Sequence, residues 1–254
     1  MIRRIYVSEI DRDNLSKHKT IEGGPRDTFD YRNLVVKKPW GYEYLLFEND
    51  FVAIWVLHLK KGHGTSMHCH PLKKTSLVIL SGKAQSSTLS EWFDLEVLDG
   101  LFLENGVFHT TKALSDEVFV MEIETPPNKK DLVRLKDSYG REGKGYEGIN
   151  MMSRELKKFK HVFFEKRDII SQEKKRLNAV RLQMRHCQTN LLEKELDKSK
   201  KKKLYAILEE KIIDPAHKEI FGAGNIFMLE HVNKIKNIRM YNNSLLFSVE
   251  LVET

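Results

Sequence analysis

Histidines gather in two short stretches of the chain. The first reads Gly62-His63-Gly64-Thr65-Ser66-Met67-His68-Cys69-His70, and the second reads Gly106-Val107-Phe108-His109. Successive side chains of a β-strand point to opposite faces, so His68 and His70 share one face and Cys69 takes the other. Three neutral imidazoles can hold a divalent metal (Zn, Fe, Ni, Co or Mn) and leave a coordination position open. We predict such a site at His68, His70 and His109; the alternative is that the three rings are polar fillers of a barrel mouth.

Short β-strands must position these histidines. Val78-Ile79-Leu80, ended by Ser81-Gly82, predicts the next strand of an antiparallel sheet. Residues 51–59 are apolar on both faces, which predicts a central strand and makes His58 a core histidine. Residues 117–124 predict a further strand with Val118, Val120, Glu122 and Glu124 on one face. The turn Asp99-Gly100 predicts a hairpin that pairs residues 91–98 with residues 101–103.

Composition narrows the class of protein. Of the 254 residues, 41% are hydrophobic and 31% charged, and the net charge is +7. The basic run at residues 198–203 contains no aromatic residue, so we expect a solvated segment and no nucleic-acid partner. No apolar run approaches the ~20 residues that span a bilayer, and residues 1–5 lack a signal-peptide core, so we expect a cytoplasmic protein without a membrane partner. Two distant cysteines, Cys69 and Cys187, exclude a disulfide framework.

The histidine spacing resembles the cupin family. Gly62, His68, His70 and Gly82 fit the first cupin motif, and Gly106 and His109 fit the second. The resemblance implies a jelly-roll barrel, also called a double-stranded β-helix, with a metal at the histidines. Two positions depart from the motifs: Thr75, or Lys74 with a spacing one shorter, stands where the first motif has its metal-binding Glu, and Glu104 stands where the second has Pro.

Residues 36–141 also resemble the cupin domain of type II mannose-6-phosphate isomerases. The likeness rests on Lys38-Pro39-Trp40-Gly41-Tyr42-Glu43 at its start and on residues 131–141, Asp-Leu-Val-Arg-Leu-Lys-Asp-Ser-Tyr-Gly-Arg, at its end. It implies a small anionic sugar as substrate. Glu122 is then a candidate general base or replacement ligand, and Lys73 a second catalytic candidate that could also grip phosphate. Arg134, Arg141 and Lys74 are the candidates for substrate binding.

The composition changes after Arg141. We divide the chain into an N-terminal arm (1–33) of loop or dimer-contact character, a metal-binding cupin domain (34–141), a Gly-rich linker (142–150) and a second unit (151–254). In that unit, residues 162–164, 179–185, 224–230 and 245–251 predict strands, and residues 191–213 predict a charged helix with Leu204, Ile207 and Leu208 as its apolar stripe. We expect a mainly β bicupin whose degenerate second barrel carries a helical insertion; an α+β appendage for dimerisation is the alternative.

Three functions fit these patterns. The first is a metal-dependent isomerase- or epimerase-like enzyme for a phosphorylated or nucleotide-linked sugar of polysaccharide biosynthesis, active as a homodimer. The second is a three-His Fe(II) dioxygenase, because such a site leaves room for substrate and oxygen. The third is a non-catalytic sugar-binding cupin. The missing motif carboxylate favours the last two, and the isomerase-like segments favour the first.

Overall fold

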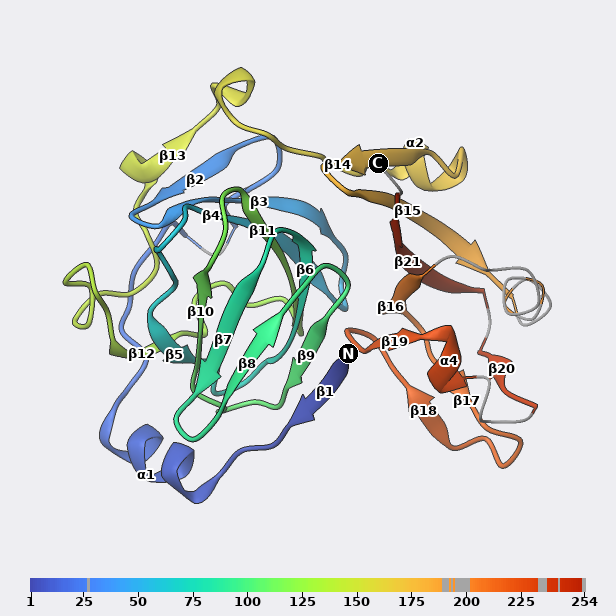
Figure 1. The fold of residues 1–254 in the computed structure, drawn as a ribbon, viewed down its shortest axis with the longest axis horizontal. Helices are drawn as coiled ribbons and strands as arrows, with labels where there is room; N and C mark the ends of the chain where they lie inside the picture. Colours follow the sequence, from blue (N-terminus) through green and yellow to red (C-terminus); the bar gives the residue numbers. More distant parts are fainter. Residues whose placement is uncertain are drawn as a thin grey trace.

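The structure is a computed structural model and describes residues 1–26, 28–188, 192, 194, 202–232, 237–241 and 243–252. Strands dominate it (Figure 1), which confirms the predicted mainly β class. The strands up to residue 136 are β1 (Ile2–Ile5), β2 (Val35–Lys38), β3 (Gly41–Glu48), β4 (Ala53–Leu59), β5 (Met67–Cys69), β6 (Lys74–Ser81), β7 (Ala84–Thr88), β8 (Trp92–Leu95), β9 (Gly100–Leu103), β10 (His109–Ala113), β11 (Val118–Thr125) and β12 (Val133–Lys136).

The later strands are β13 (Met152–Ser153), β14 (Lys174–Leu177), β15 (Val180–Cys187), β16 (Lys203–Glu209), β17 (Ile212–Ile213), β18 (Glu219–Phe221), β19 (Ile226–Met228), β20 (Arg239–Met240) and β21 (Ser244–Leu251). The helices are short: α1 (Glu9–Lys17), α2 (Lys166–Ile170), α4 (Leu229–Val232) and the 3₁₀ turns η1 (Ile149–Met151) and η2 (Leu156–Lys158). In the part of the chain described, no helix has the length and apolar character needed to cross a bilayer.

Two sheets enclose the predicted metal site. The larger has the strand order β1-β9-β6-β11-β4-β3-β2-β13, and the smaller has the order β12-β5-β10-β7-β8. Strand β4 lies between β11 and β3, as its two apolar faces predict. Two facing sheets with the histidines on the smaller one are the arrangement that the cupin prediction requires.

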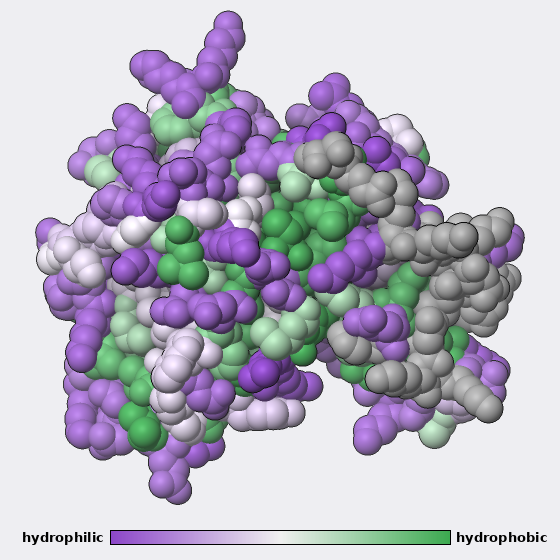
Figure 2. Space-filling view, viewed as in Figure 1, coloured by the Kyte–Doolittle hydropathy of each residue, from purple (hydrophilic) through white to green (hydrophobic). Residues whose placement is uncertain are grey.

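The larger sheet buries both of its faces. Val118 and Val120 of β11 belong to a cluster inside the two sheets, whereas Phe119 and Met121 of the same strand belong to another cluster. This second cluster extends to residues of β15, β16 and β21, including Phe247. The C-terminal strands therefore cover the outer face of the larger sheet. On the face drawn in Figure 2, hydrophobic side chains gather where the two groups of strands meet.

The predicted hairpin across Asp99-Gly100 is wrong. β8 pairs with β7 in the smaller sheet, whereas β9 pairs with β6 in the larger sheet. Leu98, at φ 68°, lies between them in the left-handed region, and the chain changes sheet there. A turn signal specifies a local reversal of direction, but it cannot specify which sheet each flanking strand joins.

The N-terminal arm is also more ordered than expected. β1 adds a parallel edge strand to β9, and α1 begins with a capping box in which Ser8 and Asp11 exchange hydrogen bonds. The pattern Ser8-x-x-Asp11 is the sequence signal for this helix. The contacts of β1 are within the chain, and the predicted homodimer stays a prediction.

The C-terminal strands confirm part of the expectation. β15 and β21 pair along their length, and β19 lies near the predicted position. Residues 162–164 form no strand. Leu204, Ile207 and Leu208 lie on β16 rather than on a helix, because they are packed between two clusters and the strand buries both faces. The remainder of the predicted helix, residues 191, 193 and 195–201, lies outside the described residues.

This C-terminal group consists of a five-stranded sheet (β14-β15-β21-β16-β19) and a three-stranded sheet (β18-β17-β20). The predicted division at residues 33, 141 and 150, and the predicted second barrel, stay predictions. One connection crosses the division: β13 pairs with β2, so the chain after residue 141 returns to the larger sheet.

Candidate metal centre

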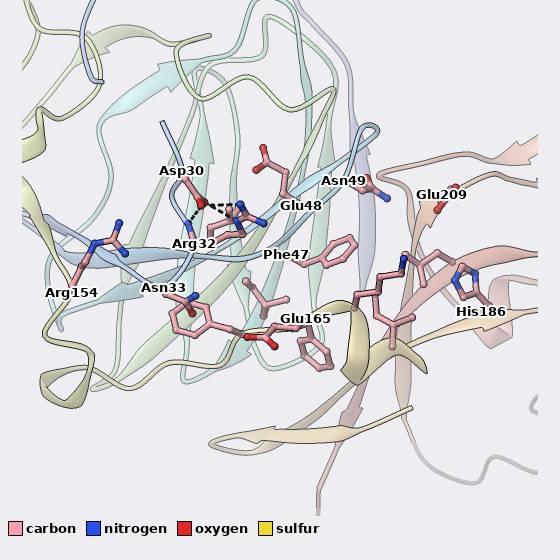
Figure 3. Close-up of a pocket in the computed structure, with 17 residues that line it drawn as sticks. Asp30, Arg32, Asn33, Phe47, Glu48, Asn49, Arg154, Glu165, His186 and Glu209 are labelled. Carbon is pink, nitrogen blue, oxygen red and sulfur yellow. Dashed lines mark hydrogen bonds and ion pairs between the residues drawn. The ribbon is translucent and has the colours of Figure 1, made fainter. Parts of the chain in front are cut away.

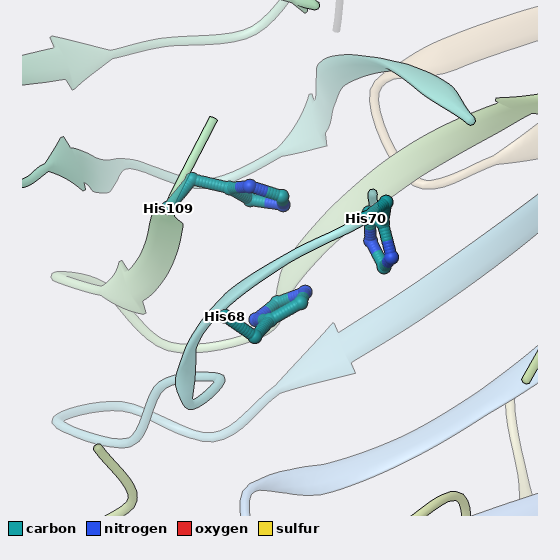
Figure 4. Close-up of side chains that lie close together, drawn as sticks. All are labelled: His68, His70 and His109. Atoms are coloured by element: carbon teal, nitrogen blue, oxygen red, sulfur yellow. The ribbon is translucent and has the colours of Figure 1, made fainter. Parts of the chain in front are cut away.

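The three predicted ligands come together. One ring nitrogen from each of His68, His70 and His109 lies within 4.8 Å of the other two, and all three residues are buried. His68 on β5 is paired directly with His109 on β10, and His70 follows two positions later on the same face. Figure 4 shows the rings converging from these elements. Cys69 points the other way, into a cluster with Phe108 and Val133, as the strand alternation predicts.

Backbone carbonyls orient all three rings. The Nδ1 atoms of His68, His70 and His109 lie 2.8, 2.5 and 3.0 Å from the carbonyl oxygens of Ser66, Asp131 and Val107. A carbonyl can only accept, so each Nδ1 carries a proton, and the Nε2 of a neutral ring then keeps its lone pair. The Nε2 atoms of His70 and His109 are buried without a hydrogen-bond partner. Unpartnered inward lone pairs and anchored outer nitrogens are what metal-binding histidines require.

The protonation state suits this role. Burial lowers the pKa of His109 to about 4, and the neighbouring His70 contributes to the shift. Burial also lowers the pKa of His68 well below its ordinary value, with His109 and His70 acting in the same direction. Both rings are therefore neutral at pH 7, and a neutral imidazole is the form that binds a metal.

A backbone hydrogen bond connects the turn before His109 to His70. The Gly106 N–H donates to the carbonyl of His70 at 2.8 Å, and Gly106 has a φ of +83°, which favours glycine. Helix α1 secures the other side, because the carboxylate of buried Asp11 accepts the N–H of Phe108 at 3.0 Å. The arm thus helps to position the strand that carries His109.

Glu122 lies beside the three histidines. Its Oε1 is 3.6 Å from Nε2 of His70, and its side chain is buried. Burial alone would raise the pKa of Glu122, but the ring of His70 beside it and the charges of Lys129 and Lys73 hold it well below its usual value. Thr75, where the first cupin motif has its Glu, lies on the adjacent strand β6, so β11 supplies a carboxylate near the ring of His70 that β6 lacks.

A buried ionic wall closes the cavity around this site. Lys73 Nζ lies 2.8 Å from Glu124 and donates to the carbonyl of Asn128 at 2.9 Å, with its side chain 1% exposed. Lys129 Nζ lies 3.2 Å from Glu43 and 3.4 Å from Glu124. Both contacts engage the ammonium of Lys73, so Lys73 has the contacts of a residue that positions Glu124.

The predicted phosphate-binding residues are already engaged. Arg134 donates to the carbonyls of Lys144 and Gly145, and Arg141 forms ion pairs at 2.7 Å with both Asp137 and Glu147. Both arginines line the cavity, but their charges are met by carboxylates. Lys74 does not line it; its Nζ pairs with Glu104 at 3.0 Å, and its side chain is 44% exposed. Lys74 is the first residue of β6 and directly follows Lys73, so alternation sends its side chain to the opposite face.

Several residues of the wall were not predicted. Their common property is that they lie far apart in the sequence and pair only in the folded chain: Lys38, Glu43, Trp55, Glu124, Lys129, Asp131, Tyr146 and Glu147. Tyr146 donates to Glu43, and Lys38 pairs with Glu147. Lys38 and Glu43 belong to the isomerase-like segment, so the sequence resemblance could have indicated them. Glu124 lies on the predicted face of β11. Nothing in the sequence marks Lys129 or Tyr146.

The metal cavity is small, about 50 Å³, which is room for an ion and a few water molecules. Larger cavities lie outside it. One of about 690 Å³ is drawn in Figure 3; its lining includes Phe47 of β3, Glu165 at the start of α2 and His186 of β15, and none of the three site histidines. Another, of about 540 Å³, shares Glu124 and Lys129 with the metal cavity.

No protein-family model matches the chain. No curated protein matches it either. Solved structures similar to it include KdgF from Halomonas sp., at 13% identity and a TM-score of 0.35 over 42% of this chain and 96% of that one. An RmlC-like cupin from Shewanella frigidimarina is 14% identical, with a TM-score of 0.36 over 42% of this chain and 95% of that one. The capsular polysaccharide assembling protein CapF from Staphylococcus aureus is 21% identical, with a TM-score of 0.36 over 44% of this chain and 34% of that one. At such TM-scores the function of this chain has to be inferred from the residues of its site.

Proposed function

We propose that this protein is a metal-dependent enzyme that isomerises or epimerises a small phosphorylated or nucleotide-linked sugar. The observation that carries the proposal is the convergence of three backbone-anchored imidazoles beside the buried carboxylate of Glu122. The type of substrate and its place in polysaccharide biosynthesis rest on the sequence resemblance of residues 36–141 alone.

The donor set fits a divalent metal. Two Nε2 atoms are buried without partners, and the backbone carbonyls of Asp131 and Val107 hold the same two rings through their Nδ1 protons. A divalent ion bound there would supply Lewis-acid polarisation of a carbonyl or hydroxyl oxygen. Zn, Co, Ni, Mn and Fe are all compatible with an imidazole donor set.

Glu122 is the residue that we assign to proton transfer. It is ionised at neutral pH, it lies next to His70, and it lines the same cavity as the histidines. A carboxylate in that position can accept a proton from the carbon next to a carbonyl and return it to the adjacent carbon. Lys73 contributes by holding Glu124 in the wall rather than by exchanging a proton itself.

Proton exchange with solvent tests this proposal. The purified protein is first analysed for bound metal, and the metal-loaded protein is then incubated with mannose 6-phosphate or fructose 6-phosphate in D₂O and followed by ¹H NMR. We expect deuterium to replace the proton next to the carbonyl. The Glu122→Gln variant should keep its metal and lose the exchange, and the control variant Asp116→Asn, at an exposed carboxylate, should retain both.

Two results would contradict the proposal. A protein that keeps its histidine geometry but takes up no divalent metal would exclude the metal-dependent function. Undiminished exchange in the Glu122→Gln variant would exclude Glu122 as the base. Oxygen consumption by the iron-loaded protein, without exchange, would instead support the dioxygenase alternative.

A further inference from the structure

The metal cavity cannot hold a sugar in the arrangement seen here. Its volume is about 50 Å³, whereas sites for small molecules are typically about 300–1,000 Å³. The neighbouring cavity, at about 540 Å³, falls within that range. Glu124 and Lys129 line both cavities, so the two cavities are neighbours.

The wall of the larger cavity is aromatic. Phe29 and Tyr31 of the N-terminal arm lie edge to face, 4.9 Å between ring centroids, and Tyr31 lies 5.2 Å from Trp55 of β4 in the same way. All three residues line the cavity. The electron-rich face of an aromatic ring attracts the weakly positive C–H groups of a sugar ring, so three such side chains in one cavity favour a carbohydrate.

Polar atoms without partners occur on the same wall. The indole Nε1 of Trp55 and the Oε2 of Glu124 are buried and form no hydrogen bond. One is a donor and the other an acceptor, and a hydroxyl group can satisfy both kinds. Such unpartnered buried atoms destabilise a protein unless a ligand or water satisfies them.

Three cations, Arg26, Lys129 and Lys130, and two carboxylates, Glu48 and Glu124, line this cavity. Arg26 is exposed there and has no ion pair with another described residue, and Lys130 lines the same region. Arg26 differs in this respect from Arg134 and Arg141, whose partners are carboxylates and carbonyls of the chain. A guanidinium matches the oxygens of a phosphate group.

Lys129 lies at the junction of the two cavities. Its Nζ is 3.7 Å from the centroid of the Trp55 ring and is held by Glu43 and Glu124. The residue therefore covers the aromatic face on one side and faces the metal cavity on the other. A displaced Lys129 would uncover Trp55 and Glu124 and join the two spaces.

We infer that the 540 Å³ cavity lined by Phe29, Tyr31 and Trp55 binds the sugar ring of a carbohydrate phosphate, with Arg26 at the phosphate and Lys129 as the movable partition before the metal cavity. This inference rests on the proposed function for the nature of its ligand. It assigns substrate binding to the N-terminal arm and not to Arg134, Arg141 or Lys74.

Calorimetric titration of the EDTA-treated full chain tests the binding site without the metal. The probes are mannose 6-phosphate and fructose 6-phosphate, with mannose and inorganic phosphate for comparison. We expect the sugar phosphates to bind more tightly than either comparison compound.

Arg26→Ala should weaken sugar-phosphate binding about tenfold, because one charge-assisted contact is lost. It should leave the binding of mannose unchanged. Trp55→Phe should weaken both, whereas the matched controls Lys112→Ala and Trp92→Phe, at exposed positions outside the cavity, should change neither.

A second measurement tests the connection between the cavities. In the Co(II)-loaded protein, mannose 6-phosphate should change the visible absorption spectrum, because a sugar that displaces Lys129 reaches the ion. An unchanged spectrum with binding intact would overturn the role of Lys129. No binding of any probe to the EDTA-treated protein, or equal affinities in wild type, Arg26→Ala and Trp55→Phe, would overturn the binding site even if the metal-loaded enzyme exchanges protons. Binding to a protein that takes up no metal would support the site and refute the proposed function.

Discussion

The two groups of strands in this chain differ in what their interiors contain. Between the two sheets of residues 35–136, the interior contains an apolar cluster and, beside it, the three histidines and a wall of paired charges. Between the two sheets of the C-terminal strands, the interior is an apolar cluster that includes Tyr205, Ile207, Phe227 and Leu246. Among the described residues, the C-terminal group has no cluster of potential metal ligands.

This difference matters because apolar interiors and interiors with paired charges stabilise a protein in different ways. Apolar side chains stabilise a sheet pair simply by leaving water, at about 25 cal/mol per Å² of buried surface. Buried charges stabilise it only when every charge keeps its partner. The C-terminal interior is apolar, in contrast to the charged cavity of the first group, and the second barrel stays a prediction. Four experiments can show whether the two interiors are as independent as this difference suggests.

The largest effect should come from the apolar interior. Phe227 is fully buried and stacks on Phe221 and Tyr205. Phe227→Ala should lower the free energy of unfolding by about 3–5 kcal/mol, because it leaves a cavity. Urea denaturation measures the change, and the metal content of the folded variant should equal that of wild type. Trp92→Ala, 71% exposed, is the control and should lie within about 0.5 kcal/mol of wild type. A loss of metal in folded Phe227→Ala would show that the two interiors are not independent.

A fall in pH should destabilise the charged interior. Glu147 is buried among Lys38, Arg134 and Arg141; burial alone would raise its pKa, but these cations lower it to about 2. A carboxylate with a depressed pKa stabilises the fold above its unfolded value, near 4.5, and that contribution is lost as the pH falls towards 2. The loss should reach about 3 kcal/mol. In urea titrations between pH 6 and 2, Glu147→Gln should be less stable at pH 6 and should depend less on pH. An equally steep profile for this variant would refute the assignment, and Glu155→Gln, at an exposed position, should match wild type.

Removal of a histidine should lower the affinity for the metal and leave the protein folded. His109→Ala should lower the affinity for Zn²⁺ by at least about 100-fold, or roughly 2.7 kcal/mol, since ligand loss should exceed the effect of losing an outer partner. Competition with a chromogenic chelator measures the affinity. The control is His63→Ala, an exposed histidine of the same sequence stretch. Equal affinities for the two variants would mean that the three rings do not share one ion.

A smaller loss of Zn²⁺ affinity is expected from substitution of Asp131, whose backbone carbonyl orients the ring of His70. The carboxylate of Asp131 accepts the N–H groups of Leu72 and Lys73 at 2.9 Å, and this fixes the carbonyl to which His70 donates. Asp131→Ala should therefore weaken Zn²⁺ binding about tenfold, the lower end for an outer partner. The same chelator assay measures it, with Asp116→Ala as the exposed control. An unchanged affinity would show that the loop holds its shape without this carboxylate.

Strand periodicity explains why much of the site was predictable. His68 and His70 share a face because side chains alternate, and the same rule placed Glu122 and Glu124 together on β11. The central position of β4 followed from its two apolar faces. Alternation is a local property, so a short sequence specifies it.

The wrong predictions concern features that are not local, because they depend on contacts between distant parts of the chain. Nothing within residues 91–103 shows that β8 and β9 belong to different sheets. Arg134 and Arg141 were assigned to phosphate because of their type, yet Glu147 and Asp137 already pair with Arg141, and carbonyls of Lys144 and Gly145 already bind Arg134. The β16 residues have an apolar pattern that fits a helix or a strand buried on both faces, and packing against two clusters decided between them.

The sequence by itself determined the ligand histidines, the faces on which they lie and the mainly β class, because each depends on alternation and turn chemistry within a few residues. Only the tertiary structure decided which charges face one another, how small the metal cavity is, and that the N-terminal arm lies against Trp55. Those features arise from contacts between residues such as Lys38 and Glu147, 109 positions apart, and a pairing at that distance depends on how every intervening strand is packed.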